Sequence, residues 1–307
     1  MILTVTPNTA LDVTYTLERL VPDATHRALA VRSRAGGKGM NVARVVRAAG
    51  GEACAVGTAG GAEAALLGAD LTAAGLPHEL VPIGGSTRRT VTLISTVDST
   101  TTLVNEPGPE LAPAEWATLT GTVRRLLPAA GALVCAGSLP PGAGGYTDLL
   151  ALAGDLPTIL DTSGAALTAA LPARPTVVKP NAAELREVTG HNDPVAAAHR
   201  LRAAGARAVV VSLGADGLLA VTAEGAWHAR PSRPLTGNPT GAGDAAVAGM
   251  ALELAAGSAW PRVLRRAVAL SAAAVLGPLA GDVDLEHYQR EYEAVIIEED
   301  HATGSDS

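Results

Sequence analysis

A glycine-rich loop that ends in an acidic residue is the strongest chemical signal in the 307-residue sequence. It runs over Asn238–Asp244 with the letters NPTGAGD, and an alanine-rich helix is expected directly after it. Gly241 and Gly243, on either side of Ala242, let backbone N–H groups turn outward at the positive end of the helix dipole, which suits a phosphate. Asp244 would repel that phosphate unless it has a role, such as accepting the proton of an attacking hydroxyl group. The alternative is that Asp244 only caps the helix.

A second loop carries a lysine among glycines. Gly36–Asn41 reads GGKGMN between an expected strand and an expected helix, and it lacks the spacing of a Walker A loop. Lys38 and Lys179 are the only lysines in a chain that otherwise uses arginine. A retained lysine indicates a need for a compact positive charge, and we favour a functional role for Lys38 over a solvated turn.

The segment Lys179–Glu184 follows the expected strand Thr176–Val178 and reads KPNAAE. Asn181 and Glu184 are three residues apart and share one face of a helical turn. An amide oxygen and a carboxylate can hold a hydrated Mg²⁺ ion through its waters. The simpler interpretation is an ordinary helix start, with Asn181 as N-cap and Glu184 bonding back to it.

Weaker signals complete the set of candidate residues. Ser212–Gly217, with Ser212, Gly214 and Gly217, permits a close backbone approach that a nucleotide could use, although a plain turn looks similar. Three further features could bind a sugar or its phosphate: Asp12 after an apolar strand, the adjacent Arg88 and Arg89, and Ser138 in the turn Gly137–Gly142. Their structural alternatives are a loop-capping carboxylate, a solvated edge and a rigid turn.

Composition excludes several classes of protein. The sequence is 48% hydrophobic and 17% charged, which excludes wholesale disorder, and its net charge of −7 argues against a general nucleic-acid or anionic-membrane surface. No HExxH motif and no GxGxxG after the first strand are present, which counts against a tight transition-metal site and a nucleotide-dependent dehydrogenase. With no signal peptide or long apolar stretch, we expect a soluble cytoplasmic protein without nucleic-acid or membrane partners.

Short apolar runs alternate with helical patterns along the chain. Continuous apolar runs, rather than alternating ones, predict parallel strands buried on both faces, and the alternation predicts a doubly wound α/β sheet with helices on both faces. The expected strands are Ile2–Thr6, Ala53–Gly57, Ala132–Ala136, Thr158–Asp161, Thr176–Val178 and Ala208–Leu213. The expected helices are Asn41–Ala49, Pro113–Leu127, Pro194–Ala204, Gly241–Ala256 and Trp260–Leu276.

Another group of segments predicts a smaller, less buried sheet. Thr90–Val97 and Thr101–Val104 flank the turn signal Asp98-Ser99-Thr100, and Thr9–Thr16 and Leu29–Ser33 could be its other strands. Such a layer between early βα units could be a lid over a site at the carboxyl ends of the main strands. The acidic end of the chain, 298–307, is expected to be disordered.

The order of these motifs resembles the PfkB (ribokinase-like) carbohydrate kinase family. The early GGKGMNVAR and the late PTGAGD are its two signatures, and the resemblance runs from Ile2 to about Gly277. TPNTALD at Thr6–Asp12, GSLPPG at Gly137–Gly142 and KPNAAEL at Lys179–Leu185 are similar to the branch of 1-phosphofructokinases and tagatose-6-phosphate kinases. The resemblance implies one ribokinase-like kinase domain over 1–297, with lid strands from about 9–35 and 86–106.

The resemblance also implies roles for the candidate residues. Asp244 is the expected catalytic base, and Gly241, Ala242 and Gly243 form the expected anion hole. The residues implied to bind sugar hydroxyls are Asp12, Gly37 and Asn41, and those implied to bind the phosphate of the substrate are Lys38, Arg88 or Arg89, and Ser138. The residues implied to face ATP and Mg²⁺ are Lys179, Asn181 and Glu184, with the two latter holding the metal through water; Ser212, Gly214 and Gly217 lie along the nucleotide.

We therefore expect an ATP-dependent kinase that phosphorylates a primary hydroxyl group of a ketohexose phosphate of the fructose 1-phosphate or tagatose 6-phosphate type. The branch also implies a homodimer formed through the lid. Ala245 follows the catalytic aspartate where this branch usually has serine, and a small effect is expected because the carboxylate remains. The alternatives are a kinase of an unphosphorylated sugar or nucleoside, and a non-catalytic sugar or nucleotide sensor.

Overall fold

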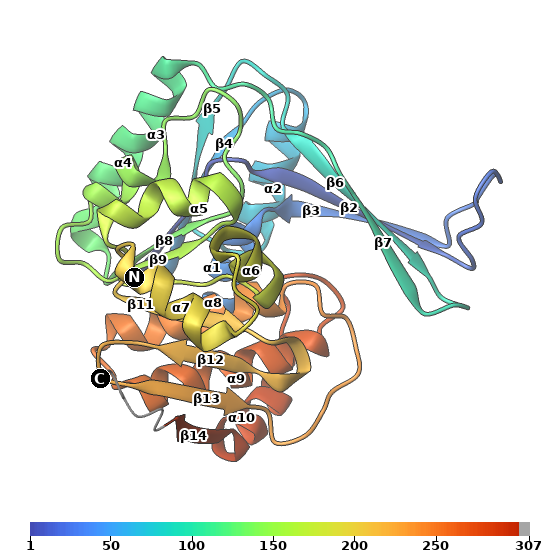
Figure 1. The fold of residues 1–307 in the computed structure, drawn as a ribbon. Coiled ribbons are helices and arrows are strands. Elements are labelled where there is room, and N and C mark those ends of the chain that lie inside the picture. Colours follow the sequence, from blue (N-terminus) through green and yellow to red (C-terminus); the bar gives the residue numbers. More distant parts are fainter. Residues whose placement is uncertain (301–307) are drawn as a thin grey trace.

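The structure is a computed structural model that describes residues 1–300. A long, mostly parallel sheet forms its centre (Figure 1). Within these residues the sheet has ten strands in the order β14-β13-β12-β11-β10-β9-β8-β1-β4-β5. Neighbouring strands pair in parallel along the part of this order that runs β11-β10-β9-β8-β1-β4-β5. At the other end, β12, β13 and β14 add antiparallel pairs. The strands are β1 Ile2–Thr6, β4 Ala53–Ala59, β5 His78–Pro82, β8 Ala132–Ala136, β9 Thr158–Asp161, β10 Val177–Val178, β11 Ala208–Ser212, β12 Leu218–Val221, β13 Ala226–Arg230 and β14 Ile296–Asp300.

Helices cover both faces of this sheet, as the continuous apolar strands predict (Figure 1). Successive strand residues point to opposite faces, so Ile2 and Val134 join one buried cluster while Leu3 and Leu133 join the other. The helices whose residues join the first cluster are α1 Lys38–Ala48, α2 Glu63–Ala73, α8 Ala242–Ala255 and α9 Trp260–Val275, with α10 Leu285–Ala294 beside them. The helices whose residues join the second are α3 Pro113–Leu126, α4 Tyr146–Ala151, α5 Gly164–Ala170, α6 Ala182–Thr189 and α7 Pro194–Ala203.

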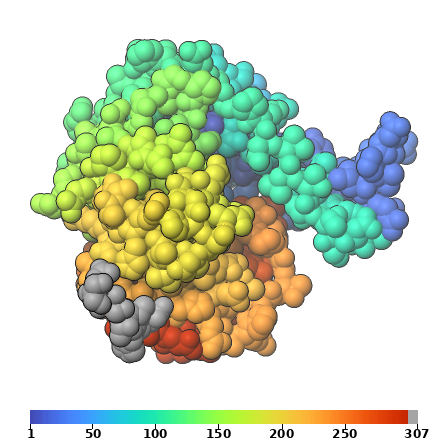
Figure 2. Space-filling model, viewed as in Figure 1, coloured from blue at the N-terminus to red at the C-terminus, as the bar shows by residue number. Residues whose placement is uncertain are grey.

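The second sheet is the expected lid. Its order is β3-β2-β6-β7, with β2 at Ala10–Leu17, β3 at Ala30–Gly36, β6 at Arg88–Ser95 and β7 at Thr100–Asn105. The sheet stands out from the body on one side of the molecule (Figures 1 and 2). Every residue of β7 is exposed, so this strand lacks the buried face that its Thr/Val alternation predicts. We call these four strands the lid.

One expectation about the end of the chain is wrong. Residues 298–300 belong to β14, which pairs with β13, whereas a disordered acidic tail is expected from residue 298. Ile297 packs against a buried cluster and Arg230 of β13 pairs with Glu298 at 3.3 Å, so the acidic residues extend an edge strand that the preceding isoleucines anchor. The rest of the expected tail, 301–307, lies outside the described residues. None of the helices in residues 1–300 is both long and apolar enough to cross a membrane.

Candidate active site

Two cavities are lined by neighbouring residues at the N-terminus of α8. The larger, of about 700 Å³, lies between the lid and the carboxyl ends of the main strands; we call it the lid cavity. The smaller, of about 560 Å³, lies beside α8 and α9, and we call it the helix cavity. Gly241 and Asp244 line the lid cavity, whereas Ala242 and Gly243 line the helix cavity. A group transferred from one cavity to the other would therefore pass these residues.

The glycine-rich loop has the predicted glycine-dependent geometry at Gly241, whereas Gly243 lies in the first turn of α8. Gly241 is the N-cap of α8 with φ of 86°, a left-handed conformation that favours glycine, and no side chain caps the helix. Asp244 lies in the first turn of α8 instead, so the interpretation of Asp244 as a helix cap is wrong. Lys179 lies next to the loop. A Cβ atom on Gly243 would lie 3.4 Å from the Nζ atom of Lys179.

The Asp244 carboxylate is buried and oriented by an amide. Nδ2 of Asn41, on α1, donates a hydrogen bond of 2.8 Å to Oδ2 of Asp244. Burial, followed by the negative charge of Asp161, raises the pKa of Asp244 to about 6, while Lys38, Asn41 and Lys179 oppose the rise. A carboxylate with this pKa is deprotonated at neutral pH and still basic enough to accept a proton in a reaction.

A buried carboxylate links the two lysines of the chain. Asp161 ends β9 with 1% of its side chain exposed; its Oδ1 lies 2.8 Å from Nζ of Lys38 and its Oδ2 lies 3.6 Å from Nζ of Lys179. Burial alone would raise the pKa of Asp161, but Lys179 and Lys38 outweigh it and lower that pKa. Likewise, burial would lower the pKa of Lys38, but Asp161 outweighs it and raises that pKa. Asp161 therefore holds both ammonium groups near Asp244, and the sequence analysis did not single it out.

Asp12 lines the lid cavity from strand β2. Its carboxyl group occupies the space beside Gly36, where a Cβ atom would lie 2.1 Å from it. Burial raises the pKa of Asp12 to about 6, against a hydrogen bond from Thr90 and the charge of Arg88. Gly37, with φ of 105°, lines the same cavity at the N-cap of α1. The segment Thr6–Asp12 thus brings an acidic acceptor to the cavity wall, and the segment Gly36–Asn41 brings Gly37 to it.

The structure separates the two adjacent arginines. Arg88 lines the lid cavity, and its Nε donates to the backbone oxygen of Asn8 at 3.3 Å. Arg89 points elsewhere: its Nη2 lies 2.7 Å from Oε1 of Glu63, and 52% of its side chain is exposed. Ser138 also lines the lid cavity, and its Oγ accepts a 2.9 Å hydrogen bond from Nδ2 of Asn8. Arg88 and Ser138 thus share a neighbour on this wall, whereas Arg89 lies outside the lining.

Asn181 and Glu184 form the helix start that the simpler interpretation predicts. Asn181 Oδ1 accepts from the Glu184 N–H, and Glu184 Oε2 accepts from the Asn181 N–H, each at 2.8 Å. Asn181 lines the helix cavity and Glu184 the lid cavity. In residues 1–300 no three His, Cys, Asp or Glu side chains could hold a metal ion by themselves. Glu184 supplies a carboxylate, the ligand type that Mg²⁺ takes together with phosphates and water.

The remaining candidates line the helix cavity. Ser212, Gly214 and Gly217 lie in its wall, where β11 turns into β12. Gly217 has φ of 85°, and a Cβ atom there would lie 2.1 Å from the backbone oxygen of Ala229. Packing against β13 therefore already requires glycine at 217. Val268 and Val275 of α9 add apolar surface to the lining of the same cavity.

The sequence of this chain is similar to those of known carbohydrate kinases. The family model described as pfkB family carbohydrate kinase matches residues 5–286. A 1-phosphofructokinase of Xanthomonas campestris is 40% identical over 265 residues, which are 82% of this chain and 83% of that protein. An ATP-dependent 6-phosphofructokinase isozyme 2 of Mycobacterium tuberculosis is 36% identical over 303 residues, 95% of this chain and 89% of that protein.

Solved structures agree with the family match. Two structures of phosphofructokinase-2 from Escherichia coli superpose with a TM-score of 0.87 at 31% identity, covering 95% of this chain and 98% of that chain. One of them is a complex with fructose-6-phosphate, and the other is a tetrameric inhibited form. The resemblance inferred from the sequence motifs is thereby confirmed, as is the α/β fold with its separate small sheet.

Proposed function

Because the chain belongs to the pfkB family of carbohydrate kinases, we propose that it transfers the γ-phosphate of ATP to a primary hydroxyl group of a ketohexose phosphate. The observation that carries the proposal is the position of Asp244 and the Gly241–Gly243 loop at the junction of the two cavities. The lid cavity would hold the sugar phosphate, and the helix cavity would hold the nucleotide. The acceptor hydroxyl and the terminal phosphate then meet at Asp244.

Asp244 acts as the general base in this proposal. The sugar oxygen forms a bond to the γ-phosphorus, its proton passes to the Asp244 carboxylate, and the bond between the γ-phosphorus and the leaving oxygen of ADP breaks. Asn41 holds Oδ2 of Asp244 at 2.8 Å and so orients the carboxylate. General-base catalysis contributes about 10²–10⁴-fold in enzymes.

The surrounding groups offset the charge of the transferred phosphoryl group. The backbone N–H groups of Gly241 and Gly243 lie at the N-terminus of α8, where the helix dipole is positive, whereas the Ala242 N–H donates to the backbone oxygen of Pro239 at 3.2 Å. Lys179 lies directly below this loop. Asn181 and Glu184 would hold Mg²⁺ through its waters, and the ion, when bound, would neutralise part of the phosphate charge. Preorganised charge of this kind supplies most of the help that phosphoryl transfer needs.

The lid cavity supports a substrate that already carries a phosphate. Lys38, Arg88 and Ser138 line it, which places two positive groups and a hydroxyl around the same cavity as Asp12. Asp12 would accept hydrogen bonds from sugar hydroxyl groups, and Arg88 would bind the phosphate by charge-assisted bonds. Arg89 is left out of this assignment because, within residues 1–300, it is not among the residues that line the lid cavity, and its guanidinium pairs with Glu63.

Fructose 1-phosphate is the acceptor that we propose first, since the Xanthomonas relative is a 1-phosphofructokinase. Fructose 6-phosphate is the second candidate, because the Mycobacterium relative is named a 6-phosphofructokinase. A coupled ADP-release assay with fructose 1-phosphate, fructose 6-phosphate, tagatose 6-phosphate and free hexoses tests both. We expect the highest kcat/KM with a ketohexose phosphate; equal turnover of the free sugars would contradict the phosphate site.

We also propose that two copies pair through the lid. Leu29, Val31, Leu103 and Val104 are exposed apolar side chains on or next to the lid strands. A phosphofructokinase-2 structure to which this chain is similar is tetrameric, which supports self-association. Light scattering of wild type and Val104→Asp tests the pairing: a dimer that the substitution converts to monomer supports it, and a monomeric wild type contradicts it. A cytoplasmic location stays a prediction.

A further inference from the structure

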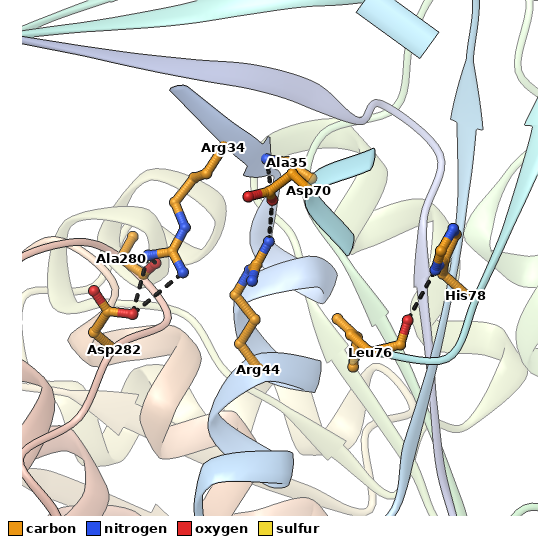
Figure 3. Close-up of polar contacts among 8 residues, drawn as sticks. All are labelled: Arg34, Ala35, Arg44, Asp70, Leu76, His78, Ala280 and Asp282. Carbon is orange, nitrogen blue, oxygen red and sulfur yellow. Dashed lines mark hydrogen bonds and ion pairs between the residues drawn. The ribbon is translucent and has the colours of Figure 1, made fainter. Parts of the chain in front are cut away.

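Arg34 makes a contact that the proposed mechanism does not use. It lies on β3 at the base of the lid, and its side chain crosses to the segment between α9 and α10 (Figure 3). Nη1 donates to the backbone oxygen of Ala280 at 2.9 Å, and Nη1 and Nη2 lie 3.1 and 3.2 Å from Oδ1 of Asp282. Only 15% of the Arg34 side chain is exposed. The contact is therefore a partly buried, charge-assisted link between the lid and the body.

The segment that Arg34 contacts, between α9 and α10, packs against the phosphoryl-transfer loop. A Cβ atom on Gly241 would lie 2.9 Å from Cα of Ala280, so Ala280 packs directly on the first residue of that loop. A Cβ atom on Gly281 would lie 3.4 Å from Cα of Asn41, the residue whose amide orients Asp244. A shift of this segment would therefore displace both Gly241 and Asn41, because close-packed interiors transmit small displacements.

The other end of the link lies beside the acceptor site. In the β2–β3 ladder Arg34 is the partner of Asp12, the carboxylate on the wall of the lid cavity. The next residue, Ala35, donates its N–H to Oδ2 of Asp70 at 2.8 Å, and Arg44 of α1 binds the same oxygen (Figure 3). The strand is therefore held at two successive residues, by α2 on one side and by the α9–α10 segment on the other.

We propose that Arg34 is a positioning residue, which through Asp282 and Ala280 fixes the Asp12 side of the lid cavity relative to the Gly241–Asp244 loop. The inference rests on the proposed kinase function. In it, the ion pair between Arg34 and Asp282 keeps the acceptor hydroxyl group aligned with the transferred phosphoryl group. Alignment of this kind matters because a misplacement of about 1 Å can cost roughly 100-fold in rate.

A direct role for Arg34 in binding the phosphate of the substrate is the competing explanation, because Arg34 also lines the lid cavity. Asp282 distinguishes the two. It is absent from the residues that line the lid cavity in the described chain, so Asp282→Asn breaks the ion pair without removing a group from the cavity wall. A double-mutant cycle on kcat therefore measures the link itself.

The experiment compares wild type, Arg34→Ala, Asp282→Asn and the double variant with saturating ATP and the sugar phosphate preferred by wild type. We expect each single variant to lose about 10- to 100-fold in kcat, with the KM for ATP unchanged within about twofold. The double variant should lose no more than Arg34→Ala, because both changes break one link. Arg34→Lys should recover part of the kcat, since an ammonium can still reach one of the two oxygens.

Arg32→Ala is the matched control. Arg32 lies two residues earlier on β3, is exposed, and takes part in no ion pair within residues 1–300; it should retain wild-type kcat. Full kcat in Asp282→Asn, multiplied losses in the double variant, or a rise in the sugar-phosphate KM alone for Arg34→Ala would each overturn the proposal. Turnover by wild type in the same assay reports separately on the kinase function, and thermal unfolding of each variant verifies that it is folded.

Discussion

Replacing Asp161 by asparagine removes the carboxylate charge that lies between the ammonium groups of Lys38 and Lys179. The Oδ1 and Oδ2 atoms of Asp161 lie 2.8 and 3.6 Å from the two Nζ atoms. Lys179 has only 5% of its side chain exposed, whereas 38% of the Lys38 side chain is exposed. The substitution therefore leaves Lys179 as a buried positive charge without its counter-ion, while water can reach Lys38.

The expected loss of stability follows from this difference in burial. Removing one partner of a buried ion pair costs about 3–5 kcal/mol, and we expect the lower end, about 3 kcal/mol, because Lys38 can be hydrated. With an unfolding entropy of roughly 2.1 cal/mol/K per residue, this corresponds to a fall in Tm of about 5 °C for a chain of this size.

The pH dependence of this loss has a defined sign. The lysines lower the pKa of Asp161 in the folded protein, so its ionised form stabilises the fold above the ordinary pKa of aspartate. This contribution disappears as the pH falls through the lowered pKa. At pH 7 to 8 the full difference between wild type and Asp161→Asn should be present, and it should shrink in strong acid.

The same substitution should change the pH profile of the reaction. Asp161 is one of the causes that raise the pKa of Asp244 to about 6, after burial itself. Asp161→Asn should therefore move the acidic limb of kcat/KM to lower pH. The ionisation of the sugar phosphate is common to both enzymes, so the shift between the two profiles belongs to the protein.

Calorimetry and pH–rate profiles measure these two effects, with Asp155→Asn as the control. Asp155 is an exposed residue shortly before β9, so the same chemical change there should leave both readouts at wild-type values. An unchanged Tm together with an unchanged acidic limb in Asp161→Asn would refute the assigned charge partnership.

Three further predictions concern the cavities. Asp244→Asn should lower kcat about 10²–10⁴-fold, with ATP affinity by calorimetry retained, and its residual rate should lose the part of the acidic limb near pH 6 that is due to Asp244; near-normal turnover would remove the base role. Arg88→Ala should lower kcat/KM for the sugar phosphate about 10- to 150-fold, whereas Arg89→Ala should stay within about twofold because an exposed pair contributes little; equal effects would contradict the separation of the two side chains. Gly36→Ala places a Cβ atom 2.1 Å from the Asp12 carboxyl group and should raise the KM for the sugar phosphate severalfold while leaving the KM for ATP unchanged; an unchanged sugar-phosphate KM would count against Asp12.

The main sheet could be predicted from sequence because its strands are buried on both faces. Ala132–Ala136 and Thr158–Asp161 coincide with β8 and β9, since a continuous apolar run bounded by turn residues leaves little choice of limits. The edge strands β5 and β14, and β13 beside β14, were missed, because polar and charged residues are tolerated on strands at or next to a sheet edge. For this reason the acidic residues after Ile297 were predicted to begin a disordered tail, although residues 298–300 belong to β14.

Side-chain partners were harder to predict than loops. Asp161 lies 123 residues from Lys38 in the sequence, and Arg34 lies 248 residues from Asp282, so no local spacing reveals either pair. Asp161 gave one weak signal, a carboxylate at the last position of a buried strand, where parallel strands place ligand-binding groups. Arg88 and Arg89 could not be distinguished from composition, but they are neighbours on one strand and must point to opposite faces.

The structure of a ternary complex with the preferred sugar phosphate and a non-hydrolysable ATP analogue tests the central claim most directly. We predict the terminal phosphate of the analogue against the backbone N–H groups of Gly241–Gly243, with the acceptor hydroxyl oxygen within about 3 Å of the Asp244 carboxylate. Nucleotide and sugar phosphate bound together with Asp244 turned away from that hydroxyl group, or with the terminal phosphate far from the loop, would contradict the account.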